Sequence, residues 1–140
     1  MRPLLKEFIR RVVHPAPRDR AWAAGIALFL IANLFYHGAQ PYAVGAVPAP
    51  WDKPAHVVIF FLIGTLAWIA FAGRRFWAVF LVCAAVAGTD ELAQLMNPGR
   101  EVEVFDWLAD IGGVALAGLL LSHLRARMLA PALLRSRLTR

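Results

Sequence analysis

Acidic, basic and amide side chains gather in three short stretches of this otherwise apolar sequence. Carboxylates and an imidazole could transfer protons or bind a cation, and lysine or arginine could hold a phosphate or carboxylate group. The stretch from Gly88 to Asp110 alone contains six carboxylates and lies beside two apolar runs. The candidate site residues are Asp52, Lys53, His56, Asp90, Glu91, Gln94, Arg100, Asp106 and Asp110.

The spacing within each stretch places the polar side chains on one face of a helix. Asp106 and Asp110 are four residues apart and Glu91 and Gln94 are three apart, which are the spacings of neighbours on a helix surface. Small residues continue these rows, and such rows let helices approach closely. They are Gly113 and Ala117 after Asp110, and Ala84, Ala87 and Gly88 before Glu91.

The composition excludes an ordinary small soluble fold. The chain has 140 residues, which allows one domain, and 60% of them are hydrophobic, with a mean hydropathy of +0.59. These values predict an integral membrane protein. The net charge of +6 does not indicate a nucleic-acid partner, because the basic residues gather at the two ends of the chain. Cys83 lies inside an apolar run and is expected to be a small core residue.

Four apolar runs predict an all-α bundle of four transmembrane helices, with amphipathic basic segments at both ends. We expect the helices at about residues 22–40, 52–72, 76–96 and 107–124. The third must continue through Asp90 and Glu91, because the apolar residues before them are fewer than the ~20 that a span requires. A cleaved signal peptide is a weaker interpretation of the first run, whose apolar core is long for a signal.

Three parts of the chain follow from this pattern. Residues 1–20 form a basic N-terminal segment, which is either an amphipathic helix on the membrane surface or a partly ordered tail. Residues 21–124 form the transmembrane domain. Residues 125–140 form a basic, leucine-rich tail that we expect to be interfacial or frayed.

The distribution of lysine and arginine predicts the orientation in the membrane. Thirteen of the fifteen lie in the N-terminal segment, the C-terminal tail and the Arg74-Arg75 turn, whereas the other two loops contain only Lys53 and Arg100. Both termini should therefore be cytoplasmic, with the candidate site residues near the outer face.

The sequence motifs resemble the VanZ-like family of bacterial membrane proteins. The motifs are D-K-x-x-H-x-x-x-F-x-x-x-G at 52–64, D-E-x-x-Q at 90–94, P-G-R at 98–100 and D-x-x-x-D-x-x-G at 106–113. The resemblance implies a small multi-pass protein of the bacterial inner membrane, and the founding member of the family is linked to glycopeptide (teicoplanin) resistance. Asp110 departs from the pattern, because the family more often has Asn there.

The predicted outer side carries more negative than positive charge. Seven carboxylates face two cations there, which leaves five negative charges unpaired at full ionisation. A charge at membrane depth costs about 2.5–3.5 kcal/mol by insertion scales, and less near the interface. Protonation, His56, water, a metal ion or a cationic ligand would have to compensate the acids. The acids are either a buried network that fixes helix register or part of a pocket that opens outward.

Three functions fit an outward-facing pocket. The favoured one is a binding protein, in which Lys53 and Arg100 hold the phosphate or carboxylate of a lipid-linked envelope precursor or a lipoglycopeptide. The second is an intramembrane enzyme with Glu91 or Asp106 as general base and His56 as acid, or with His56 and carboxylates on a divalent metal ion.

The third is proton-coupled transport through the carboxylates, for which four helices form a thin pore. We expect no cofactor, because zinc-ligand pairs such as H-E-x-x-H are absent. The expected partners are the lipid bilayer and the amphiphile, and association with further copies of the chain stays open.

Overall fold

The computed structural model describes residues 3–73, 75–96 and 103–138, and the elements in these ranges are all helices. They are α1 (Pro3–Val13), α2 (Pro17–Gly38), the short 3₁₀ helix η1 (Pro41–Ala43), α3 (Asp52–Ala70), α4 (Phe76–Gln94) and α5 (Val104–Leu138). Four of them are long and apolar enough to cross a membrane, namely α2, α3, α4 and α5 up to Met128. The predicted four-helix membrane bundle is therefore confirmed, and the chain is a multi-pass membrane protein.

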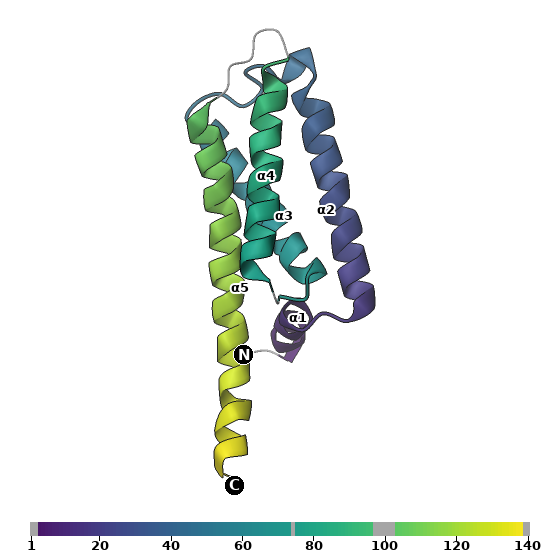
Figure 1. Ribbon diagram of the computed structural model, residues 1–140, viewed down its shortest axis with the longest axis vertical. Helices are drawn as coiled ribbons and strands as arrows, with labels where there is room; N and C mark the ends of the chain where they lie inside the picture. Colours follow the sequence, from purple (N-terminus) through teal and green to yellow (C-terminus); the bar gives the residue numbers. More distant parts are fainter. Residues whose placement is uncertain (1–2, 74, 97–102, 139–140) are drawn as a thin grey trace.

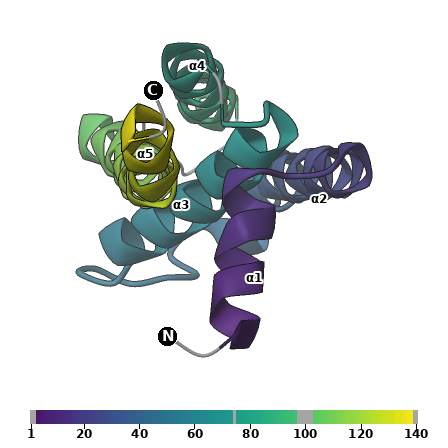
Figure 2. The same ribbon diagram turned by 90° about the horizontal axis from the view of Figure 1, so that it is seen from below.

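The four long helices run side by side, and α1 crosses below them (Figures 1 and 2). Helix α3 is the centre of the bundle, because it packs most extensively on α5 and next on α2. Apolar side chains from α3, α4 and α5 form the core, including Phe60, Val79, Cys83 and Val114. Cys83 is buried, as its place in an apolar run predicted.

Two glycines allow α3 and α5 to approach closely. A Cβ atom on Gly64 would lie 3.2 Å from the Cα atom of Val114, and one on Gly113 would collide with the backbone of Val57 and Phe61. The small residues predicted to continue the row after Asp110 therefore lie in this interface, with Ala117 fully buried. Close backbone contact of this kind is what small residues permit between membrane helices.

Two arginines bind the carbonyl groups at the end of α3. The Nε atom of Arg20 on α2 donates to the Ala70 carbonyl at 2.9 Å, and Nη1 of Arg125 on α5 donates to the carbonyls of Ala72 and Gly73. The last carbonyls of a helix have no partner within it. Gly73 has a φ of +62°, which turns the chain toward α4 at little steric cost.

Several helix limits differ from the prediction. Helix α2 begins at Pro17, because proline suits a first-turn position and the Asp19 carboxylate accepts a hydrogen bond from the backbone nitrogen of Ala16 at 3.3 Å. Helices α3 and α4 end two residues earlier than predicted, at Ala70 and Gln94. Helix α5 continues without a break from the transmembrane domain to Leu138.

The N-terminal segment is helical, which agrees with the amphipathic interpretation. Leu4 and Phe8 expose 83% and 65% of their surface, and Glu7 pairs with Arg10 and Arg11. These two guanidinium groups lower the pKa of Glu7 to about 2. An exposed apolar row beside charged residues is typical of a helix at a membrane surface.

Candidate functional site

The polar residues converge where α3 and α5 begin and α2 and α4 end; we call this the site end (Figure 1). Four polar side chains are buried there despite the cost of removing such groups from water. Their exposed fractions are 3% for Asp90, 3% for Glu91, 4% for Gln94 and 0% for Asp110. Both chain termini lie toward the opposite end of the bundle (Figure 1).

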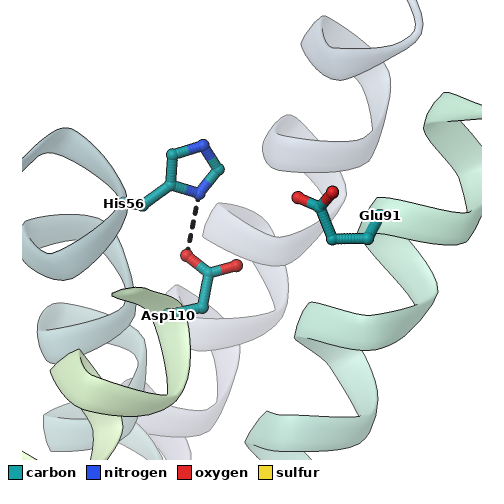
Figure 3. Close-up of side chains that lie close together, drawn as sticks. All are labelled: His56, Glu91 and Asp110. Carbon is teal, nitrogen blue, oxygen red and sulfur yellow. Dashed lines mark hydrogen bonds and ion pairs between the residues drawn. The ribbon is translucent and has the colours of Figure 1, made fainter. Parts of the chain in front are cut away.

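His56 connects α3 to α5. Its Nδ1 atom lies 2.8 Å from Oδ1 of Asp110, and its Nε2 atom lies 3.7 Å from Oδ2 of Asp106 (Figure 3 shows the first contact). The spacing of four residues brings both aspartates to the same face of α5, as the sequence predicted. Asp110 therefore fixes one ring nitrogen of His56, and the other is directed toward Asp106.

Lys53 lies among three acids, Asp52, Glu103 and Asp106, and we call these four residues the lysine group. The ammonium nitrogen lies 2.9 Å from Asp52 Oδ2 and 2.6 Å from Glu103 Oε2, and it also contacts Asp106 Oδ1. The contact with Glu103 is a hydrogen bond, and the contacts with Asp52 and Asp106 are ion pairs. Lys53 therefore compensates the chain's own acids, while its side chain stays 33% exposed.

Glu91 is bound by neutral donors. The backbone nitrogen of Glu103 donates to Glu91 Oε2 at 3.2 Å, and the amide of Gln94 donates to Glu91 Oε1 at 3.4 Å and to Asp90 Oδ2 at 3.3 Å. The contact with Glu103 ties the end of α4 to the start of α5. These bonds orient the buried carboxylates but do not neutralise them.

A cavity of about 610 Å³ lies at the site end. Its polar wall includes His56 and several carboxylates, and its apolar wall comes from Leu34 on α2 and from the segment that joins α2 to α3. The lining includes His37, Val44, Val47, Asp52, Ala55, Asp90, Gln94, Glu103 and Asp106. The cavity combines hydrogen-bond acceptors with an apolar surface, as sites for amphiphilic ligands do.

Eight of the nine predicted site residues fall in the described part of the chain, and all eight lie at the site end. Lys53, with Asp52 and Asp106, belongs to the lysine group; His56, Glu91 and Asp110 form a second group, and Asp90 and Gln94 line the cavity. Arg100 lies outside the described residues.

The sequence did not predict the place of Glu103 in the site, nor the apolar wall of the cavity. Glu103 was counted among the acids but was not expected in the site, although it binds Lys53 and, through its backbone nitrogen, Glu91. The sequence position of Glu103 could have indicated its role. It comes one residue before α5, so its side chain must lie near the first turn of that helix, where Asp106 is. The segment 43–49 and Leu34 were also missed, because their apolar composition gives no sign of a site.

Two groups of donors in the described residues are close enough to hold a metal ion. One consists of the acids of the lysine group and the other consists of His56, Glu91 and Asp110, whose ligand atoms lie within 4.8 Å of one another in each group. Imidazole nitrogen and carboxylate oxygen together suit divalent ions such as Zn²⁺ or Mn²⁺. Lys53 already occupies the first group, so the second is the better candidate.

A family model described as VanZ/LLP1 matches residues 21–125 of the chain. Comparison with curated proteins and with solved structures gave no match. The matched range begins one turn into α2 and ends at Arg125 within α5. It contains the whole of α3 and α4 and every polar residue of the site end. The predicted family resemblance is confirmed by this match: the chain belongs to the VanZ/LLP1 family of membrane proteins.

Proposed function

We propose that this protein binds an amphiphile of the cell envelope in the cavity at the site end. The observation that carries the proposal is the two-sided lining of that cavity, with His56 and carboxylates on one wall and Leu34, Val44 and Val47 on the other. The apolar wall would receive a lipid chain, and the polar wall would receive its head group.

The charges of the polar wall indicate which head groups fit. Asp52, Asp90, Glu103 and Asp106 line the cavity, and Lys53 is already bound to three carboxylates. Carboxylates accept hydrogen bonds and repel anions. The head group should therefore present many N–H and O–H donors, as sugars and peptides do. The sugar and peptide parts of lipoglycopeptides and of lipid-linked envelope precursors present such donors.

In this proposal Lys53 has a different role from the one that the sequence suggested. The sequence suggested that Lys53 would hold a phosphate or carboxylate of the ligand, but its ammonium group already contacts Asp52, Glu103 and Asp106. In the proposal Lys53 keeps the carboxylates in position, and these carboxylates contact the ligand.

We also propose that the protein lies in the bacterial inner membrane with both termini cytoplasmic. Support comes from the concentration of arginine in the N-terminal segment, the 74–75 turn and the C-terminal tail. With this orientation the cavity opens at the outer leaflet, where envelope amphiphiles are exposed. A reporter fused after Arg140 should be active only as a cytoplasmic enzyme; activity of a periplasmic reporter would contradict the orientation.

Filling the cavity tests the binding proposal. Ala55 lines the cavity, whereas Ala85 is exposed on α4 and lies outside it, so Ala55→Phe and Ala85→Phe form a matched pair. In detergent micelles, Ala55→Phe should weaken binding of a fluorescent lipoglycopeptide at least tenfold, and Ala85→Phe should leave binding unchanged. Parallel assays with a delipidated glycopeptide and with a lipid-linked precursor identify the source of the ligand. Equal binding by the wild-type protein and Ala55→Phe would contradict the proposal.

One observation favours a second candidate function, an intramembrane enzyme. Asp110 holds Nδ1 of His56 while Nε2 is directed toward Asp106, and a carboxylate that orients a histidine is common in general acid–base catalysis. Incubation of the protein with a lipid-linked precursor, followed by mass spectrometry, should then reveal a product that disappears in His56→Ala. No change of mass would leave only the binding function.

A further inference from the structure

The two acid groups at the site end differ in how much positive charge lies next to their carboxylates. In the lysine group one ammonium nitrogen contacts all three carboxylates. The second group consists of His56, Glu91 and Asp110. Among the described residues, the His56 imidazole contacts the Asp110 carboxylate, and neutral amide groups donate hydrogen bonds to the Glu91 carboxylate. Asp110 and Glu91 are 0% and 3% exposed. The carboxylates of this deeply buried group therefore have less positive charge beside them than those of the lysine group.

Asp110 keeps one oxygen atom without a hydrogen-bond partner among the described residues. Its Oδ1 atom binds His56, whereas Oδ2 is buried and has no such partner. The carboxylate of Glu91 is directed toward the His56–Asp110 pair from the opposite helix (Figure 3). Two buried carboxylates that face each other repel unless a proton or a cation lies between them.

We propose that a divalent transition-metal ion, of which Zn²⁺ is the first choice, binds between His56, Glu91 and Asp110. The donor set is one imidazole nitrogen and two carboxylates, and each comes from a different long helix. Ions of intermediate hardness prefer this mixture, whereas Mg²⁺ and Ca²⁺ prefer oxygen ligands alone. The ion would supply the positive charge that this group lacks.

The geometry needs only small side-chain adjustments. The donor atoms lie within 4.8 Å of one another, and zinc takes nitrogen and oxygen ligands at about 2.0–2.2 Å. Donors on opposite sides of one ion are then about 4 Å apart at most. The ion would take the place of the direct contact between His56 and Asp110 and would leave room for a water molecule or a ligand atom.

The metal site adds to the proposed function but does not depend on it. His56 lines the cavity, so an ion bound to His56 would lie at its polar wall. A phosphate, which the bare carboxylates repel, could then bind through the ion. Metal binding is measured without an amphiphile, and lipoglycopeptide binding is measured in a chelator, so failure of one proposal is distinguished from failure of the other.

The chain offers a matched pair of variants. Glu91→Gln removes a proposed ligand, and Glu103→Gln makes the same chemical change in the lysine group while keeping the backbone N–H that binds Glu91. The full chain, purified in detergent without a histidine tag, is stripped with chelator and dialysed against Zn²⁺. Elemental analysis should find about one ion per chain in the wild-type protein and in Glu103→Gln, and at least tenfold weaker binding in Glu91→Gln.

Three further measurements keep the test independent of folding. Circular dichroism confirms that each variant is helical, and zinc X-ray absorption of the wild-type protein should show a single histidine with oxygen ligands. The thermal midpoint of the wild-type protein should rise with Zn²⁺ concentration, since a ligand that binds only the folded state stabilises it. A wild-type protein that takes up no stoichiometric ion, or a loss of the ion in Glu103→Gln with retention in Glu91→Gln, would overturn the proposal.

Discussion

His56 and Asp110 are 54 positions apart in sequence, yet the Nδ1 and Oδ1 atoms of these residues lie 2.8 Å apart and join α3 to α5. Asp110 is fully buried, so the contact lies inside the bundle. Its position directly above the close approach at Gly113 means that helix packing and the polar site depend on the same two helices.

Replacement of His56 by alanine should destabilise the protein by about 2–4 kcal/mol, because it leaves the Asp110 carboxylate buried without its partner. Asp110→Asn should cost less than about 1 kcal/mol, since an amide oxygen can still accept a hydrogen bond from the imidazole. The thermal midpoint in detergent measures both effects. In the double variant His56→Ala with Asp110→Asn, the loss should be smaller than in His56→Ala alone; additive losses would show that the contact contributes no coupling.

Adjacent glycines on α5 should respond in opposite ways to the same change. Gly113→Ala should destabilise the bundle by about 1–3 kcal/mol, because the added Cβ atom would collide with the backbone of α3. Gly112 has no atom within 4 Å of such a Cβ, so Gly112→Ala should be neutral or stabilising by up to about 1 kcal/mol through helix propensity. Equal midpoints for the two variants would show that α3 and α5 do not approach at Gly113.

Loss of the Lys53 ammonium group should leave three carboxylates facing one another at the start of α3 and α5. We expect Lys53→Met to lower stability by about 1–3 kcal/mol, because charge-assisted hydrogen bonds are lost. A second change, Asp106→Asn, removes one of the unpaired charges and should restore part of the loss. Absence of any such rescue in thermal melts would contradict the role of Lys53 as the internal counterion.

The opposite end of the bundle offers a comparison between two arginines of α5. Arg125 binds the carbonyls of Ala72 and Gly73, whereas Arg127 is exposed. Arg125→Met should cost about 1.5–3 kcal/mol, which is typical of hydrogen bonds to a charged group, and Arg127→Met should cost almost nothing. Protease resistance of the turn at residues 71–73 provides the measurement, and equal cleavage of both variants would exclude this function of Arg125.

Helical spacing predicted much of the site. The intervals between Asp106 and Asp110 and between Glu91 and Gln94 place each pair on one face, and the apolar run lengths place them at one end of the bundle. The observed contacts agree, since His56 meets both aspartates and Gln94 binds Glu91. The row of small residues after Asp110 also lies in a helix interface, as expected.

Spacing could not predict how the charges pair. Seven acids share the predicted outer side with Lys53, and only the folded arrangement selects Asp52, Glu103 and Asp106 as its partners. Glu103 was missed because it precedes α5 in a stretch without periodicity. The apolar wall of the cavity was missed for a different reason: Leu34, Val44 and Val47 differ in no way from lipid-facing residues until the segment 43–49 is placed over the site end.

Helix α5 is longer than a membrane is thick. Its 35 residues correspond to about 52 Å at 1.5 Å per residue, whereas the hydrocarbon core of a bilayer is about 30 Å. Since the helix is unbroken from Val104 to Leu138, the angular position of its last turns is fixed relative to Asp110. Each residue inserted between them would turn whatever is attached to the C-terminal end by about 100° relative to the site end and move it by about 1.5 Å.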